Sequence, residues 1–343
     1  MIYEFARAGL FALDAEHAHE LTLGTFARFP RLSTAPFRGR VKDQPVELLG
    51  LKFRNRVGLS AGLDKNGECI EAWDRLGFGF VEIGTVTPRP QPGNPKPRLF
   101  RLPQQRALIN RLGFNNKGVD HLVAQVRRAC FKTVLGINIG KNADTPVDKA
   151  GDDYETCLRR VHAFAGYVTV NISSPNTKNL RDLQADAALR ALLQRLARVR
   201  EELAQQEGRR APMLVKLAPD LDAADLARIG ATARECGVDG LIATNTTLQR
   251  PGLEGAPHAG EAGGLSGAPL KPLALAALTA LRKAVGPGFP LVGVGGILDG
   301  ADARERREAG ADLVQIYTGF IYRGPELVAE CSRALMDAGS AVR

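Results

Sequence analysis

The sequence predicts an α/β fold, namely a (β/α)8 TIM barrel with an amphipathic two-helix extension at its N-terminus. Eight short apolar runs alternate with helical patterns from Arg56 onward. These units occupy roughly 280 residues, the usual size of a closed eight-stranded barrel. Amide-rich and glycine-rich segments follow the apolar runs, where the strands of such a barrel end. A doubly wound open sheet is the alternative that the same alternation allows.

Composition narrows the class of protein without identifying it. Of 343 residues, 44% are hydrophobic, as is usual for a globular core. The five cysteines lie far apart without a CxxC pair, so we expect reduced thiols in the cytosol and no metal site. No apolar stretch reaches the ~18 residues of a spanning helix, and no cleavable secretory signal is recognisable. The formal net charge of +9 suits nucleic acid, anionic lipid or an acidic substrate.

Residues 1–42 form a separate unit in the sequence. A first amphipathic helix is expected up to Leu13, and Asp14 is a suitable N-cap for a second helix that Pro30 ends. This hairpin either packs on its own domain or lies on a lipid surface as a monotopic anchor. We therefore expect two domains, an amphipathic helical hairpin for membrane association over 1–42 and a barrel over 43–343.

The rest of the chain supplies the barrel. The predicted strands are 56–61, 80–85, 134–139, 167–172, 213–217, 240–244, 291–294 and 313–317. Helical patterns lie between them, including 185–207, 223–236, 270–285 and 301–309. A Pro- and Arg-rich segment over 86–116 and a Gly-rich segment over 245–267 interrupt the alternation. Because both follow strands, both are expected as loops on the catalytic face, where long loops bind or cover ligands.

The segment from Asn171 to Thr177 carries the clearest chemical signal. It places Ser174 between two carboxamides at the end of a predicted strand. Catalytic groups of these barrels gather at such strand ends. A hydroxyl among amides, with no acidic residue beside it, indicates proton abstraction from a carbon acid in a neutral, polar pocket.

Glycines and a lysine at other strand ends predict a phosphate-bearing cofactor. Glycines over 293–296 and the segment 317–320 follow the last two strands, where these barrels usually bind phosphate. Leu298 stands where a dinucleotide fingerprint requires glycine or alanine, so FMN is favoured over NAD. Lys216 ends the fifth strand inside an apolar run, and a buried lysine needs an anionic partner such as a reduced flavin. Carboxamides at strand ends offer the donors and acceptors that a heterocycle with imide groups requires.

Eight longer motifs follow one another along the chain: AGLDK at 61–65, EIGTVTPRP at 82–90, NRLGFNN at 110–116, GINIGK at 136–141, NISSPNT at 171–177, ATNTT at 243–247, GGLSG at 263–267 and GVGGI at 293–297. Together they resemble the class 2, quinone-dependent dihydroorotate dehydrogenases over nearly the whole chain. The chain has Ser60 where relatives often carry alanine, and we expect little effect from this difference.

The resemblance implies one FMN per chain and a quinone as second substrate. It implies that Ser174 is the catalytic base, where the soluble class 1 enzymes carry cysteine, and that His19 and Arg101 lie near the quinone. FMN contacts are expected from Ala61, Gly62, Leu63, Asp64, Lys65, Thr85, Asn138, Asn171, Lys216, Thr244, Gly267, Gly296, Tyr317 and Thr318. Substrate contacts are expected from Lys65, Asn110, Arg111, Leu112, Gly113, Phe114, Asn171, Asn176, Asn245 and Thr246.

The resemblance also implies the reaction and its setting. The chain would oxidise (S)-dihydroorotate to orotate in pyrimidine (UMP) synthesis, with Ser174 taking a proton from C5 and FMN a hydride from C6. Thr177 or an ordered water would relay the serine proton, and ubiquinone or menaquinone would reoxidise the flavin. We expect a monomer without nucleic-acid partners, held peripherally on the cytoplasmic side of the inner membrane.

Two other functions remain open at this point. A tRNA dihydrouridine synthase would also be an FMN barrel and would suit the positive charge, but those relatives use a cysteine where this chain offers serine. A lipid-binding scaffold on an inactive barrel is the second, because a fold does not by itself establish an activity.

Overall fold

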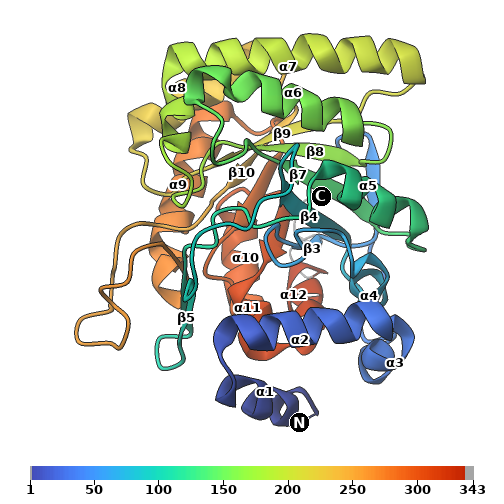
Figure 1. Ribbon diagram of the computed structural model, residues 1–343, viewed down its shortest axis with the longest axis vertical. Helices are drawn as coiled ribbons and strands as arrows, with labels where there is room; N and C mark the ends of the chain where they lie inside the picture. The colour runs from blue at the N-terminus through green and yellow to red at the C-terminus, as the bar shows by residue number, and fades with distance from the viewer. Residues whose placement is uncertain (1, 337–343) are drawn as a thin grey trace.

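Eight parallel strands close into a barrel in the computed structural model, which describes residues 2–336 (Figure 1). Each barrel strand pairs with the next one along the chain, and the last pairs with the first. This confirms the predicted TIM barrel and excludes the open sheet. In barrel order the strands are β3 (Val57–Leu59), β4 (Phe80–Val86), β7 (Val134–Ile139), β8 (Tyr167–Asn171), β9 (Met213–Leu217), β10 (Gly240–Ala243), β12 (Leu291–Val294) and β13 (Leu313–Ile316).

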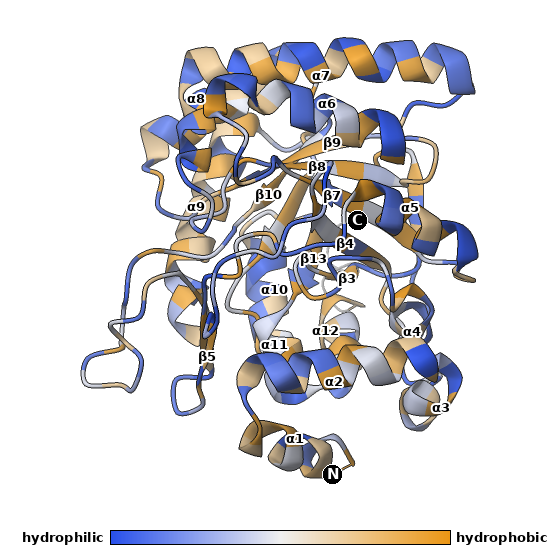
Figure 2. Ribbon diagram, viewed as in Figure 1, coloured by the Kyte–Doolittle hydropathy of each residue, from blue (hydrophilic) through white to orange (hydrophobic). Residues whose placement is uncertain are grey.

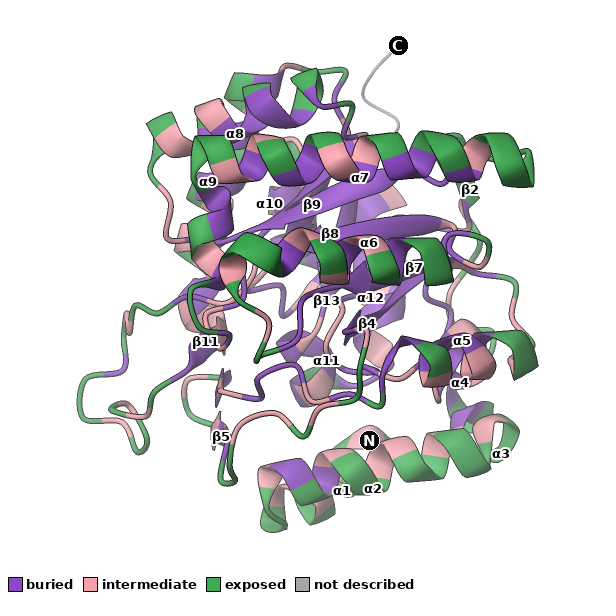
Figure 3. Cartoon of the chain, turned by 45° about the horizontal axis from the view of Figure 1, so that its top comes forward, coloured by how far each residue is buried: buried purple, intermediate pink, exposed green. Residues whose placement is uncertain are grey.

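Helices surround the barrel and bury the outward faces of its strands. In Figure 3 the strands are buried, whereas the outer faces of the surrounding helices are exposed. The four helices predicted from the sequence are confirmed to within one residue at each end. The helices are α4 (Ile70–Arg75), α5 (Val119–Arg128), α6 (Ala150–Val161), α7 (Asp186–Glu207), α8 (Ala223–Glu235), α9 (Lys271–Val285), α10 (Gly300–Glu308), α11 (Thr318–Arg323) and α12 (Glu326–Met336).

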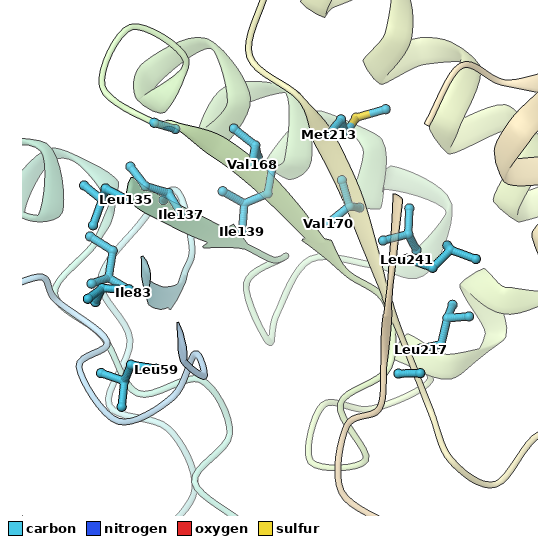
Figure 4. Packing of buried hydrophobic residues seen from close by; sticks show 14 of the residues in the cluster. Leu59, Ile83, Leu135, Ile137, Ile139, Val168, Val170, Met213, Leu217 and Leu241 are labelled. Carbon is cyan, nitrogen blue, oxygen red and sulfur yellow. The ribbon is translucent and has the colours of Figure 1, made fainter. Parts of the chain in front are cut away.

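Side chains along the barrel strands alternate between two apolar clusters. The outward positions, such as Ile137 and Val168, pack in the large cluster that includes the helices (Figure 4). Inward positions at the amino-terminal end, such as Phe80 and Leu214, form a separate cluster. Phe53 joins that cluster from a small antiparallel hairpin of β1 (Val46–Leu48) and β2 (Leu51–Phe53). The barrel interior is therefore a packed floor beneath whatever binds at the carboxyl ends.

The N-terminal hairpin consists of α1 (Ile2–Ala12) and α2 (Ala15–Arg28). Asp14 caps α2 by accepting hydrogen bonds from the backbone amides of Glu16 and His17, both at 2.9 Å, as predicted. The second helix ends before Pro30, as predicted. Pro30 also begins a short further helix, α3 (Pro30–Thr34), which we did not predict. Proline is tolerated there because the first turn of a helix needs no amide hydrogen.

The hairpin packs against its own barrel while keeping an amphipathic surface. In Figure 1, α1 and α2 lie along one end of the molecule beside α11. Buried Glu16 forms an ion pair with buried Arg98, whose Nη2 lies 2.7 Å from Oε1, and this ties α2 to the segment after β4. Figure 2 shows hydrophobic and hydrophilic residues mixed along α1 and α2.

A third sheet corrects the prediction that 86–116 and 245–267 are only loops. It contains β5 (Leu99–Leu102), β6 (Ala107–Asn110) and β11 (Gly264–Gly267), all paired antiparallel. Its strands have four residues each, and two of those in β11 are glycine, so the local pattern is weak. These strands are too short to show a clear periodicity, and their pairing with distant segments leaves no local signal in the sequence.

Candidate active site

A cavity with an open volume of about 940 Å³ lies at the carboxyl ends of the barrel strands. The third sheet contributes part of its wall through Ser266 and Gly267. Most of the predicted cofactor and substrate residues meet here, although their positions in the chain span more than two hundred residues. The cavity lining includes Ala61, Gly62, Lys65, Thr85, Asn110, Leu112, Gly113, Phe114, Asn171, Ser174, Asn176, Lys216, Thr244, Asn245, Thr246, Gly267, Gly296, Tyr317 and Thr318.

Four predicted residues lie outside this lining, namely Leu63, Asp64, Arg111 and Asn138. Leu63 faces a second cavity. Buried Asp64 accepts hydrogen bonds from two backbone amides at the start of α4. The Arg111 guanidinium pairs with Glu261, with Nη1 2.6 Å from Oε2, and Asn138 lies deeper in the barrel. The side chains of Asp64 and Arg111 are therefore engaged in structural contacts, and a role for them in ligand binding stays a prediction.

Ser174 is buried, and its Oγ accepts a hydrogen bond of 3.3 Å from the backbone amide of Asn176. The described lining residues include no carboxylate, histidine or cysteine. Hydroxyls, carboxamides and two lysines provide the polar groups instead. The described lining thus contains cations but no acidic side chain, and its hydroxyls and carboxamides match the polar surroundings of Ser174 that the sequence indicates.

The Lys216 side chain is buried and donates one hydrogen bond, of 3.1 Å, to the Oγ of Ser60. No ion pair involves it among the residues that the structure describes. Burial lowers the pKa of Lys216, and the charge of Glu82 opposes that effect. Ser60, from which we expected little, therefore holds this lysine at the floor of the cavity. A second lysine, Lys65, has its pKa lowered to about 8 by burial, with Glu16 opposing.

The turn after β12 can accept a phosphate. Gly296 has φ +70°, and a Cβ there would lie 2.4 Å from the Cα of Lys271, so no larger residue fits without a shift. Gly295 beside it also has a positive φ, of +112°. Thr318, the first residue of α11, donates to the Ser266 hydroxyl at 2.8 Å, which closes this side of the cavity. Open backbone amides, a buried cation without a carboxylate partner and a row of carboxamides together fit FMN.

The second cavity, with an open volume of about 1690 Å³, lies between the N-terminal hairpin and the barrel. Its lining is mostly apolar, and it shares Leu112 and Tyr317 with the first cavity. His19 lines it, and burial against these apolar walls, aided by the charge of Lys65, lowers the histidine pKa to about 3. Arg101 also lines it, and its Nη1 donates to the Leu10 carbonyl at 3.0 Å.

Sequence reasoning missed several polar residues in and below the first cavity. Ser266 and Gln315 line it, and Glu82 is fully buried underneath. The available signal was a charged or polar residue in the middle of an apolar strand, as for Glu82 in β4 and Gln315 in β13. Such a residue is costly to bury unless its neighbours satisfy it.

The closed barrel, the glycine turn and the buried lysine define a (β/α)8 enzyme that binds a phosphate-bearing cofactor at the carboxyl ends of its strands. A family model described as dihydroorotate dehydrogenase matches residues 44–338. The dihydroorotate dehydrogenase (quinone) of Methylibium petroleiphilum is 58% identical over 341 residues, which cover 97% of this chain and 98% of that protein. The enzyme of the same name from an Acidovorax species is 57% identical over 345 residues and 98% of each chain.

Solved structures agree with these relatives. A crystal structure of DHODH from Eimeria tenella in complex with ferulenol has a TM-score of 0.88 and 39% identity, covering 94% of this chain and 91% of that one. The chain belongs to the dihydroorotate dehydrogenase family, and its curated relatives place it in the quinone-dependent class. The resemblance inferred from the sequence motifs is thereby confirmed, and the two other functions that it left open are set aside.

Proposed function

We propose that this protein is a dihydroorotate:quinone oxidoreductase that uses FMN to oxidise (S)-dihydroorotate to orotate, a step of pyrimidine (UMP) synthesis. One observation carries the proposal: Ser174, a set of carboxamides and a buried lysine meet in a single pocket whose described lining has no acidic side chain. Curated relatives at 57% to 58% identity are named for this activity. The direct test is orotate formation from dihydroorotate and a quinone by the FMN-loaded protein, and a flavin-loaded protein without this turnover would contradict the proposal.

FMN, when bound, supplies the acceptor for a hydride from the substrate. The glycine turn at Gly295 and Gly296, with Gly267 and Thr318 opposite, would hold its phosphate. Lys216 would neutralise negative charge on the ring, since a cation in a water-poor site stabilises such charge strongly. Thr85, Asn138 and Asn171 are the polar groups that orient the ring or support those that do.

Ser174 is the group that we assign to the proton. Conversion of dihydroorotate to orotate removes a proton from C5 and a hydride from C6, so a base and a hydride acceptor are both required. The carboxamides of Asn110, Asn176 and Asn245 line the same cavity and would hold the pyrimidine ring against the serine hydroxyl. Holding the reacting groups in place lowers the entropic part of the barrier.

A serine hydroxyl is a very weak base unless it passes on its own proton. Thr177 is our candidate for this relay, because its Oγ1 is buried and has no hydrogen-bond partner among the described residues. The hydroxyl is thus free to accept from one neighbour and donate to another. An ordered water would extend the relay toward solvent.

The second cavity is our candidate for the quinone. Its apolar walls suit a quinone ring and tail, and neutral His19 and the cation of Arg101 are its polar groups. The shared wall of Leu112 and Tyr317 keeps the two cavities adjacent. Adjacent cavities allow the flavin and the quinone to exchange electrons without leaving the protein.

Residues 1–42 are the proposed membrane-associating domain, and 43–343 the catalytic barrel. Six of the seven large apolar side chains exposed in the described chain belong to residues 1–42: Ile2, Phe5, Leu13, Leu21, Phe29 and Leu32. Exposed apolar side chains flanked by arginines are typical of helices that lie on a lipid surface. Among the residues described, no helix is long and apolar enough to cross a membrane. We propose a monomer held peripherally on the cytoplasmic face of the inner membrane.

Replacing Lys216 with methionine is expected to weaken FMN binding about tenfold or more, which corresponds to ~1.4 kcal/mol. Methionine keeps the length of the side chain but removes the buried cation that the cofactor would neutralise. Titration of the apo-protein with FMN, followed by flavin fluorescence, measures the dissociation constant. The exposed Lys283, replaced in the same way, serves as the control. Equal FMN affinity in the two variants would contradict the assignment of Lys216.

A further inference from the structure

Glu82 is a fully buried carboxylate inside the barrel, in the middle of β4. Its Oε1 accepts a hydrogen bond of 2.7 Å from the Nδ2 of Asn138. Its Oε2 accepts from the Tyr167 hydroxyl at 2.9 Å and from the Nε2 of Gln315 at 2.7 Å. Within the described chain it forms no ion pair, so three neutral donors satisfy it. Burying a carboxylate costs free energy, so we expect Glu82 to have a role beyond packing.

A chain of hydrogen bonds rises from this carboxylate toward the substrate side of the cavity. The Oδ1 of Asn138 accepts from the Thr85 hydroxyl at 2.6 Å. The Thr85 Oγ1 in turn accepts from the Nδ2 of Asn171 at 2.9 Å. Each member donates toward Glu82 and accepts from the next, so the chain has one direction. Asn138, Thr85 and Asn171 stand on β7, β4 and β8, all nearly fully buried.

The upper end of the chain holds the loop that carries Ser174. The Oδ1 of Asn171 accepts from the backbone amide of Ser173 at 3.3 Å and from its hydroxyl at 3.2 Å. The Nδ2 of Asn245 lies 3.4 Å from the same oxygen. Three donors therefore converge on one carboxamide oxygen, directly before the proposed base.

The direction of the chain depends on the acceptor at its lower end. Both oxygens of Glu82 accept hydrogen bonds, so the Asn138 amide presents its NH2 group to Glu82. Without that acceptor, Asn138 and Asn171 could both turn over. The NH2 group of Asn171 would then face the backbone amide of Ser173, and two donors would oppose each other in a buried site. An unsatisfied buried donor is expensive, so the loop would shift instead.

We propose that Glu82 is a positioning residue for the proton transfer. As the acceptor inside the barrel, it fixes the orientation of Asn138, Thr85 and Asn171, and through Asn171 it holds Ser173 and Ser174 in place. This inference rests on the proposed function of the site. The same carboxylate is the anion that acts on Lys216, so one buried charge supports both the cofactor side and the substrate side.

The test compares two changes on opposite sides of the carboxylate. Glu82→Met has a similar length but removes every acceptor, and is expected to weaken orotate binding at least tenfold and to slow flavin reduction by dihydroorotate at least tenfold. Tyr167→Phe removes one donor to Oε2 and leaves the bond to Asn138, so both quantities should stay within threefold. Orotate affinity is measured from the change that orotate causes in the flavin absorption spectrum. Because only flavin-loaded molecules contribute to this spectrum, loss of stability alone would not change the measured affinity.

A conservative variant distinguishes the effect of losing the hydrogen-bond acceptor from the effect of changing the side-chain volume. Glu82→Gln keeps an oxygen for Asn138, because the Gln315 Oε1 has no hydrogen-bond partner within residues 2–336 and can turn to accept from the new amide. On a logarithmic scale, Glu82→Gln should lose no more than half as much orotate affinity and flavin-reduction rate as Glu82→Met loses. Unchanged orotate affinity and unchanged flavin reduction in Glu82→Met would overturn the inference. So would a glutamine variant as impaired as the methionine variant.

A second pair of variants decides the matter if Glu82→Met does not fold. Thr85→Val keeps the shape and interrupts the chain, whereas Thr85→Ser keeps the hydroxyl. We expect the valine variant to bind orotate at least tenfold less tightly than the serine variant, and equal affinities would overturn the inference. If Glu82→Met does fold, its effect and that of Thr85→Val should be clearly less than additive. Failure of the wild-type protein to be reduced by dihydroorotate would instead remove the proposed function.

Discussion

Replacing Ser174 with alanine is expected to slow the reduction of bound flavin by dihydroorotate by ~10²- to 10⁴-fold, the usual contribution of a positioned acid–base group. The change removes one oxygen from the wall of a cavity that contains no carboxylate, histidine or cysteine among its described residues. No carboxylate, imidazole or thiolate of the described lining is therefore available as a substitute base. FMN content should stay near that of the wild-type protein, because the loss falls on the substrate side. Stopped-flow absorbance under anaerobic conditions measures the rate.

Ser174→Cys is the matched variant for this prediction. A free thiol has a pKa of ~8.5, so the thiolate fraction rises as the pH is raised through that value. Flavin reduction by the cysteine variant should therefore recover partly at high pH, while the alanine variant stays as slow as at neutral pH. Near-normal flavin reduction by Ser174→Ala would remove this residue from the role of base.

Removal of residues 1–40 is expected to slow reoxidation of the flavin by long-tailed quinones at least tenfold, while reduction by dihydroorotate is largely spared. The hairpin supplies much of the wall of the second cavity and most of the exposed apolar side chains. The Ser174 cavity, by contrast, has no lining residue from the hairpin among those described. Steady-state turnover with a long-tailed quinone, compared with turnover with a water-soluble dye, separates the two effects.

The truncation also removes Glu16, the ion-pair partner of buried Arg98, so its thermal stability has to be measured alongside. A milder pair of changes avoids this: Phe5→Ser and Leu32→Ser alter two side chains that are 80% and 74% exposed. Together they should lower co-sedimentation with anionic lipid vesicles and leave the melting temperature unchanged. Vesicle binding and quinone kinetics that survive both the truncation and the point changes would contradict a membrane-facing hairpin.

The barrel and most of its site could be predicted from the sequence because their signals are local. Each barrel strand is a buried apolar run, and each predicted strand is found with bounds that differ by at most two residues. The polar residues that follow these runs meet in one cavity because parallel strands end at the same edge. The order of the motifs along the chain then indicated the family, which composition and net charge alone did not identify.

What the sequence did not predict depends on contacts between distant segments. The pairing of β11 with β6 joins residues more than 150 positions apart, and neither short strand has a distinctive pattern. The ion pair of Glu16 with Arg98 and the chain that starts at Glu82 are equally non-local. Arg111 and Asp64 belong to the right motifs, but their side chains are turned toward structural partners. Side-chain direction follows from packing, which a motif does not specify.

One pocket is proposed to hold FMN and dihydroorotate together, with Ser174 in its wall as the base. The most direct measurement is the visible absorption spectrum of the purified protein before and after anaerobic addition of dihydroorotate alone. We predict yellow protein whose flavin bands bleach as one orotate forms for each flavin reduced. Flavin that stays oxidised under these conditions, or protein that binds no flavin, would contradict the account.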